Sequence, residues 1–237
     1  MQRTLFSFEV PINNLTDFSD LQDFHFALST LYQYPRYKQF FVNERKQGLK
    51  TIWIDNSYNE RMVADSALEL SSIFHDVGAT RLISPDDPSW DTNRIKTEYL
   101  YTCSVTKQES VICVVNSPEM LRELQRVGAM QFALSYWVRS KLSSIELYQM
   151  SRCHFLGLLS INEIRVYQPP SCDTSMPIKL ALKDQTLREW VEEGCPHINT
   201  KDLGKEGKDF FLTEMSQEQV DLARQNIIRL KEVCNEK

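Results

Sequence analysis

Glycine is scarce in this sequence, with only 7 among 237 residues, and no G-x-G-x-x-G fingerprint follows the first apolar run. This excludes a dinucleotide-binding glycine loop. No stretch approaches the ~18 apolar residues of a membrane span, and the first residues lack a secretory signal pattern. The six cysteines form no C-x-x-C pair, which favours a reducing compartment over a disulfide framework. We therefore expect a cytoplasmic protein that does not associate with membranes.

Basic residues are outnumbered by acidic ones, 27 to 32, so the formal net charge is −5. A generally basic, histone-like nucleic-acid binder is excluded, although a local basic face is not, since phosphate contacts are local.

Short apolar runs alternate with helical patterns along the chain. Strands are expected at residues 4–10, 24–28, 51–55, 80–84, 110–115, 130–134, 154–158 and 171–173, with a helix as the rival interpretation of 24–28. Helices are expected at 61–76, 91–103, 137–150 and 216–233, from Pro118 after the N-cap Ser117, and briefly after Ser160.

Eight strands alternating with helices predict an α/β fold, a single-domain (β/α)8 barrel. A doubly wound open sheet is the alternative. Residues 1–237 would form one domain, with the barrel core at about 4–182 and a C-terminal loop and helix, 183–237, packed on it.

Polar residues close the predicted strands: Asp55 and Asn56, Asp86 and Asp87, Asn116, Ser135 and Tyr136, and Asp173. Any one of them is explained by the preference of Asp and Asn for turns and helix caps. All of them in barrel order indicate an active site, because barrel enzymes build their sites where strands meet the following loops.

Five segments resemble, in order, motifs of the tRNA-guanine transglycosylase superfamily. They are similar above all to its DNA-acting branch, the phage-type 7-deazaguanine DNA transglycosylases. Residues 51–60 (TIWIDNSYNE) resemble the D-N-G-x-x-E strand end, 83–86 (ISPD) the A-F-D segment, 114–116 (VVN) I-V-Q, and 155–158 (FLGL) M-G-V-G. Residues 173–179 (DTSMPIK) resemble the nucleophile motif D-C-V-x-P-T-R, with Lys179 in place of Arg.

The resemblance implies a glycosyltransferase that exchanges guanine in DNA for a 7-deazaguanine such as 7-cyano-7-deazaguanine (preQ0). Asp173 would be the nucleophile that forms a covalent glycosyl–enzyme intermediate, and Asp55 the general acid/base. The residues that would bind the base are Asn56, Asp86, Asn116, Ala133, Leu134, Leu156 and Gly157. The biological setting it implies is a bacteriophage, acting in the host cytoplasm, whose modified genome resists host nucleases.

The sequence departs from the family in two ways. Ser57 and Tyr58 stand where the family has two glycines, and the C-x-C-x-x-C zinc motif of the tRNA enzymes is absent. Cys195 and His197 alone do not make a metal site. We therefore expect a barrel without a zinc subdomain and without a cofactor, the 7-deazaguanine base being a co-substrate.

Residues 34–50 are the candidate nucleic-acid contact, because aromatic residues alternate there with Arg36, Lys38, Arg45 and Lys46. The alternative is an amphipathic barrel helix with aromatic residues in the core. Lys179 would contact the nucleic acid from the nucleophile motif.

Other functions remain open from the sequence: a transglycosylase acting on tRNA or a free nucleoside, and a barrel that binds a purine or nucleic acid without catalysis. Accessory proteins and a homodimer are also open. His154, in an apolar run, is interpreted as a packed core residue.

Overall fold

The computed structural model describes residues 3–196 and 210–235, apart from the side chain of Asn59. Eight strands form one parallel sheet in the order β1-β8-β7-β6-β5-β4-β3-β2. They are β1 (Leu5–Phe8), β2 (His25–Leu28), β3 (Ile52–Asp55), β4 (Arg81–Ile83), β5 (Val111–Val114), β6 (Gln131–Ser135), β7 (His154–Leu156) and β8 (Ser171–Thr174). The two ends of this order, β1 and β2, lie beside each other. The predicted (β/α)8 barrel is confirmed, and residues 24–28 hold a strand rather than a helix.

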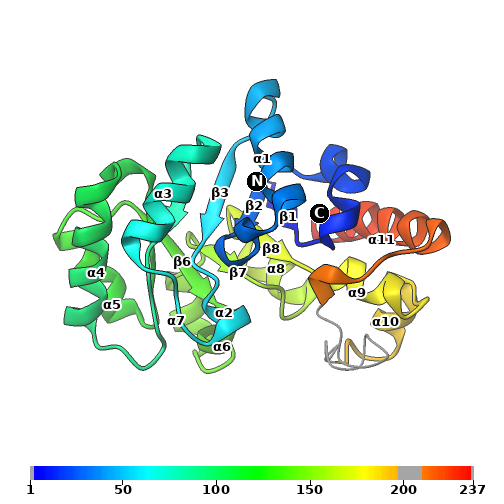
Figure 1. Ribbon diagram of the computed structural model, residues 1–237. Coiled ribbons are helices and arrows are strands. Elements are labelled where there is room, and N and C mark those ends of the chain that lie inside the picture. The colour runs from blue at the N-terminus through cyan, green and yellow to red at the C-terminus, as the bar shows by residue number, and fades with distance from the viewer. Residues whose placement is uncertain (1–2, 197–209, 236–237) are drawn as a thin grey trace.

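Helices connect successive strands and cover the outside of the barrel (Figure 1). They are α1 (Pro35–Gln47), α2 (Tyr58–Arg61), α3 (Ala67–Val77), α4 (Thr92–Val105), α5 (Pro118–Arg126), α6 (Tyr136–Arg139), α7 (Ser144–Gln149), α8 (Ile161–Tyr167), α9 (Met176–Leu182), α10 (Leu187–Glu192) and α11 (Gln217–Asn235). Short 3-10 helices are η1 (Ile12–Leu21), η2 (Ser29–Gln33), η3 (Gln108–Ser110) and η5 (Phe210–Leu212). No helix in the described part of the chain is long and apolar enough to cross a membrane.

Two predicted helices are each divided in the structure. The helix expected over 61–76 shares only Arg61 with α2 and otherwise begins at Ala67 as α3, after a turn in which Met62 has φ +58° and Ser66 forms a capping box with Glu69. The helix expected over 137–150 is α6 and α7, and here Ser143 forms a capping box with Glu146. Each box begins a new helix, since it satisfies the free N–H groups of a first turn.

The barrel interior and its outer shell are two separate apolar cores. Alternation along each strand sends Phe24, Phe26, Trp53, Ile83, Ile112, Val114, Ala133 and Leu156 into one cluster. The intervening strand residues, among them Ile54, Leu82 and Phe155, join the larger cluster under the helices. Because side chains alternate with period 2, the polar residues on the interior register, such as Asp55 and Asp173, face the barrel axis.

The seam between β1 and β2 is closed by side chains. Gln22 accepts a hydrogen bond from the Phe8 N–H (2.5 Å) and donates one to the Phe8 carbonyl (2.8 Å), as a strand residue would. Ser7 Oγ donates to Gln22 Oε1 (3.1 Å) and accepts from the Phe26 N–H (3.1 Å). The sheet is therefore completed at this seam without a backbone ladder.

The C-terminal helix α11 packs along α9, and also contacts α8 and η1. It lies at the side of the barrel away from α3, α4 and α5 (Figure 1). Its buried residues include Val220, Ala223, Ile227 and Leu230, four of the apolar residues expected to face the barrel. Asn226 is also buried, where its side chain accepts from the Leu187 N–H and donates to the Pro177 carbonyl.

Candidate active site at the mouth of the barrel

Acidic side chains collect where the strands end. Asp55 closes β3, Asp173 lies in β8, Asp86 follows β4, and Glu9 follows β1. The carboxyl ends of parallel barrel strands meet at one face, and the short helices α2 and α6, which follow β3 and β6, lie at this lower end in Figure 1. The sequence anticipated three of these four groups; Glu9 was not anticipated.

Asp173 is buried and held by two neighbours from β7 and the loop after it. His154 Nε2 lies 3.0 Å from Asp173 Oδ1, and the Gly157 N–H donates to both carboxylate oxygens at 3.2 Å. The register of the two strands explains the contact, because Phe155 pairs with Cys172 and the inward residues on either side therefore meet. His154 is consequently not only a core residue, as the sequence had suggested.

Gly157 needs the backbone freedom of glycine. Its φ of +71° lies in the left-handed region, which glycine adopts at no steric cost. This conformation turns its N–H toward Asp173 and its carbonyl toward Arg139.

Arg139 is a fully buried clamp between the loops after β6 and β7. It forms a 2.6 Å ion pair with Glu163 and donates to the carbonyls of Leu134, Leu156 and Gly157. Ser160 and Glu163 have the spacing of a capping box. Ser160 does cap α8 by accepting from the Glu163 N–H, but the Glu163 carboxylate is engaged by Arg139 instead.

The hydrogen bonds of Arg139 bear on the residues that were expected to bind the base from the loops after β6 and β7. The carbonyls of Leu134, Leu156 and Gly157 are occupied by Arg139, and the Leu134 side chain belongs to the outer core. Ala133 and Leu156 do face the barrel interior. What the loop after β7 offers to the site is the Gly157 N–H.

Asp55 is the second buried carboxyl group of the mouth. Burial raises its pKa well above the ordinary value, and the charges of Glu60 and Asp173 raise it further. The Ser57 N–H donates to Asp55 Oδ2 at 2.9 Å and opposes this shift. Asp55 is thus biased toward its protonated form, as a general acid must be.

Ser57, at the position of a family glycine, adopts a glycine-like conformation. Its φ is +56°, and its buried hydroxyl accepts hydrogen bonds from Ser29 Oγ and the Thr30 N–H, both at 3.0 Å. These contacts offset the strain of a non-glycine residue in the left-handed region. The departure from the family motif therefore leaves a glycine-like turn after Asp55.

Asn56 and Asp86 join the ends of β3 and β4. Asn56 Nδ2 donates to Asp86 Oδ1 at 2.6 Å and to the Ser84 carbonyl at 2.8 Å. Burial raises the pKa of Asp86 to about 6, and the Asn56 hydrogen bond opposes the shift. Asn116 is half-buried after β5, the next strand in the sheet.

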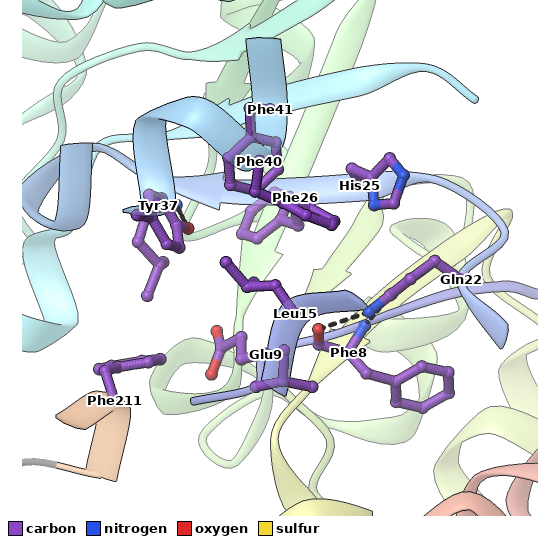
Figure 2. A pocket seen from close by; sticks show the side chains of 12 residues that line it. Phe8, Glu9, Leu15, Gln22, His25, Phe26, Tyr37, Phe40, Phe41 and Phe211 are labelled. Carbon is purple, nitrogen blue, oxygen red and sulfur yellow. Dashed lines mark hydrogen bonds between the residues drawn. The ribbon is translucent and has the colours of Figure 1, made fainter. Parts of the chain in front are cut away.

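Glu9, directly after β1, is a third carboxyl group with a strongly raised pKa. Burial, together with the charges of Asp173 and Glu60, raises its pKa to about 8. Figure 2 shows its carboxylate on the side of Tyr37 and Phe211, beside a cavity of about 20 Å³ lined mostly by apolar side chains. That volume is enough for one water molecule.

Lys179 is a cation whose charge acts on Glu9 and lowers the pKa of that carboxyl group. Burial lowers the pKa of Lys179 itself, while the charges of Glu9 and Glu60 oppose the shift. Its Nζ also lies 5.4 Å from the centroid of the Phe210 ring. Lys179 thus balances the acidic mouth from within.

The basic residues of α1 largely have local partners. Arg36 bonds Asn13, Lys38 pairs with Asp76 at 2.5 Å, and Arg45 donates to the Asp76 carbonyl at 3.0 Å. Lys46 is exposed. Tyr37, Phe40 and Phe41, the aromatic side chains between them, are buried in the outer core, as in the alternative of an amphipathic barrel helix.

Among the residues that the structure describes, no three His, Cys, Asp or Glu side chains are grouped to hold a metal ion. The Cys195–His197 fragment extends beyond them, since His197 lies outside the described residues.

Comparison with known proteins identifies the fold. No family model matches the sequence, and no curated protein matches it. Among solved structures, 3-hexulose-6-phosphate synthase from Salmonella typhimurium is similar with a TM-score of 0.51 and 14% identity, over 97% of this chain and 98% of that one. A protein from Pseudomonas aeruginosa assigned as a dihydrodipicolinate synthetase is similar with a TM-score of 0.52 and 9% identity, over 97% and 99%. At these identities the likeness establishes the barrel fold alone.

Proposed function

We propose that this protein is a pentosyltransferase that exchanges guanine in DNA for a 7-deazaguanine base. The observation that carries the proposal is the pair of inward carboxyl groups. Asp173 is hydrogen-bonded to His154 and to the Gly157 N–H, whereas burial and neighbouring charge raise the pKa of Asp55. A carboxyl group held by hydrogen bonds and a second one biased toward its protonated form are suited to be nucleophile and acid.

The reaction follows from these roles. The Asp173 carboxylate attacks C1′ of the target nucleotide, the glycosidic C–N bond breaks, and its electron pair leaves with guanine, which takes the proton of Asp55. The incoming base then attacks C1′, releases Asp173, and gives its ring proton to the Asp55 carboxylate. One residue thus serves as acid and then as base, and the nucleotide must be flipped out of a duplex to reach the mouth.

The ends of β3, β4 and β5 supply groups to recognise the base. At pH 7 an Asp86 carboxylate accepts hydrogen bonds from the N1–H and exocyclic amine of guanine, donors that a 7-deazaguanine retains. Asn56 already orients Asp86, and Asn116 lies beside them in strand order. Because Asp86 is half-buried, adenine would leave this acceptor without a donor and is disfavoured.

The choice of DNA rests on the sequence resemblance, which also suggests a bacteriophage genome protected from host nucleases. The 2′-hydroxyl is the group by which a protein distinguishes RNA from DNA. Action on tRNA and binding without catalysis are outcomes that one assay separates.

The test is base exchange followed by nucleoside mass spectrometry. Purified protein is incubated with preQ0 and either guanine-containing DNA or tRNA, beside Asp173→Asn, Asp55→Asn and the exposed control Asp221→Asn. We expect a deazaguanine deoxynucleoside from wild type and Asp221→Asn, with at least ~100-fold less from the two site variants. Product from tRNA alone would move the activity to RNA. Binding of either nucleic acid without product would leave a binding barrel.

A further inference from the structure

His154 is placed inside the barrel by an aromatic cage. Its ring lies 5.9 Å from that of Phe24, 5.6 Å from Phe26 and 5.2 Å from Trp53, measured between centroids, and only 3% of the residue is exposed. Packing on three sides fixes the orientation of the ring, so that both nitrogens point along the β7–β8 side of the interior.

Both nitrogens of this ring have partners on β8. Nδ1 lies 2.8 Å from Ser171 Oγ, and Nε2 lies 3.0 Å from Asp173 Oδ1. The nucleophile of the proposed reaction is an ionised carboxylate, which can only accept, so in that reaction Nε2 carries the proton. Nδ1 of a neutral ring then accepts from the Ser171 hydroxyl, which selects this tautomer.

We propose that Ser171 and His154 form a positioning pair that holds Asp173 Oδ1 and leaves Oδ2 as the atom that attacks C1′. The asymmetry of the contacts carries this inference. Among the residues that the structure describes, Oδ1 has His154 and Gly157 as partners, whereas Oδ2 has only the Gly157 N–H at 3.2 Å. This assignment rests on the proposed function, because it names how the nucleophile of that reaction is held.

The pair acts through both halves of the exchange. When Oδ2 bonds to C1′ and guanine departs, Oδ1 becomes the carbonyl oxygen of the ester and keeps the His154 hydrogen bond. When the incoming base displaces Asp173, the electron pair of the C1′–Oδ2 bond returns to the carboxylate, and the His154 N–H stabilises the charge that develops on Oδ1. A donor that binds more strongly as charge develops lowers the barrier.

Other titratable groups face Asp173 and bear on any pH dependence. They are Glu9 after β1, Asp55 on β3 and the Cys172 thiol on β8 itself, each of which has its pKa raised in part by the Asp173 charge. The protonation of the His154 ring must therefore be measured directly, in addition to the reaction rate.

The direct reading is 15N NMR of histidine, which is practical because the chain has only four histidines. The His154 signals are those absent from His154→Gln. We expect a neutral ring with the proton on Nε2 at pH 7. A ring protonated on Nδ1, or on both nitrogens, would overturn the inference, and this reading requires no activity.

The kinetic reading compares His154→Gln, whose amide can still donate, with His154→Phe, which fits the cage but cannot. We expect kcat to fall 10–100-fold in His154→Phe with KM changed less than about 2-fold. His154→Gln should recover most of kcat, and Ser171→Ala should lie between them. Melting temperatures and the exposed control His75→Phe separate these effects from loss of folding.

The outcomes separate the two proposals. Equal kcat in His154→Phe and wild type would overturn the positioning role while leaving the exchange reaction intact. An Nε2–H ring in a protein that exchanges no base would reject the proposed function, and would leave the Ser171–His154–Asp173 array as the holder of a carboxylate with another task.

Discussion

At the level of single residues, the mouth of the barrel holds more acidic groups than one exchange reaction needs. Glu9 and Glu60 add to Asp55 and Asp173, and each raises the pKa of another member of the group. Lys179 is the cation that acts on Glu9. Such a cluster keeps some of its carboxyl groups protonated near neutral pH, since like charges in a buried site oppose ionisation.

Glu9 gives this cluster a measurable effect on stability. Its pKa is raised from 4.5 to about 8, so the folded protein holds this proton more tightly than the unfolded chain. The contribution of Glu9 to the free energy of unfolding is therefore greatest below pH 4.5 and is lost as pH rises toward 8, with a slope of at most about 1.4 kcal/mol per pH unit.

We predict that the free energy of unfolding of Glu9→Gln falls less steeply between pH 5 and 8 than that of the wild type. Urea unfolding of wild type and Glu9→Gln at several values between pH 5 and 9 measures it. Parallel curves for the two proteins would show that Glu9 titrates normally and that its surroundings are more hydrated than described.

Site residues could be predicted from the sequence only where an acidic residue directly follows an apolar run. Asp55, Asp86 and Asp173 end apolar runs, and their position follows from barrel geometry. Glu9 lies within an expected strand and was not predicted to belong to the site, although period-2 alternation places it on the same inward face as Ser7. The contact between His154 and Asp173 depends on the register of β7 against β8. The sequence does not reveal this register, so the contact could not be predicted from it.

At the level of elements, the buried Arg139–Glu163 pair joins the loops after β6 and β7 to helix α8. Its partners include the carbonyl of Gly157, whose N–H holds Asp173. The Asp173 carboxylate is thus held by a loop that is itself held by the buried Arg139 side chain. No sequence pattern reveals this, because Arg139 and Glu163 are 24 residues apart and meet only after folding.

We predict that Arg139→Ala lowers the free energy of unfolding by about 3–5 kcal/mol, because it leaves the Glu163 charge buried without its partner. The matched control is Arg188→Ala, which breaks a 2.7 Å pair with Glu192 on an exposed helix face and should leave the free energy of unfolding nearly unchanged. Chemical denaturation measures both. Equal losses would mean that the clamp is hydrated and does not order the loop.

The divided helices were, by contrast, open to prediction. Ser66 with Glu69 and Ser143 with Glu146 have capping-box spacing in the sequence, as does Thr186 with Glu189 at the start of α10, which was not anticipated. Apolar periodicity alone carried the longer helices across these boundaries. A capping-box spacing should therefore be taken as a possible helix start even where apolar residues continue at helical spacing.

At the level of the whole molecule, the seam between β1 and β2 is closed by the side chains of Ser7, Gln22 and Asp23 and by the Asp23 N–H, which donates to the Phe6 carbonyl. Gln22 replaces a strand partner for Phe8, and it lies beside the cavity that Glu9 lines (Figure 2). Eight-strand closure could be predicted from the strand count, but the seam could not, since a glutamine between two runs has no distinctive pattern.

We predict that Gln22→Ala costs about 2–4 kcal/mol, because the buried N–H and carbonyl of Phe8 lose their partners. Amide exchange at Phe8 should accelerate more than exchange in β5. Gln33→Ala, which removes an exposed hydrogen bond to the Thr30 carbonyl, serves as control and should stay within about 0.5 kcal/mol of wild type. Unchanged protection of Phe8 would show that the backbone closes the seam without Gln22.

The central claim is that Asp173 forms a covalent bond to the sugar of its substrate. The measurement that tests it most directly is incubation with a guanine-containing DNA oligonucleotide without an incoming base, followed by denaturation and peptide mass spectrometry. We expect a DNA–protein adduct on the peptide that contains Asp173 and release of one guanine for each adduct. An adduct that persists in Asp173→Asn, or guanine release without any adduct, would contradict the account.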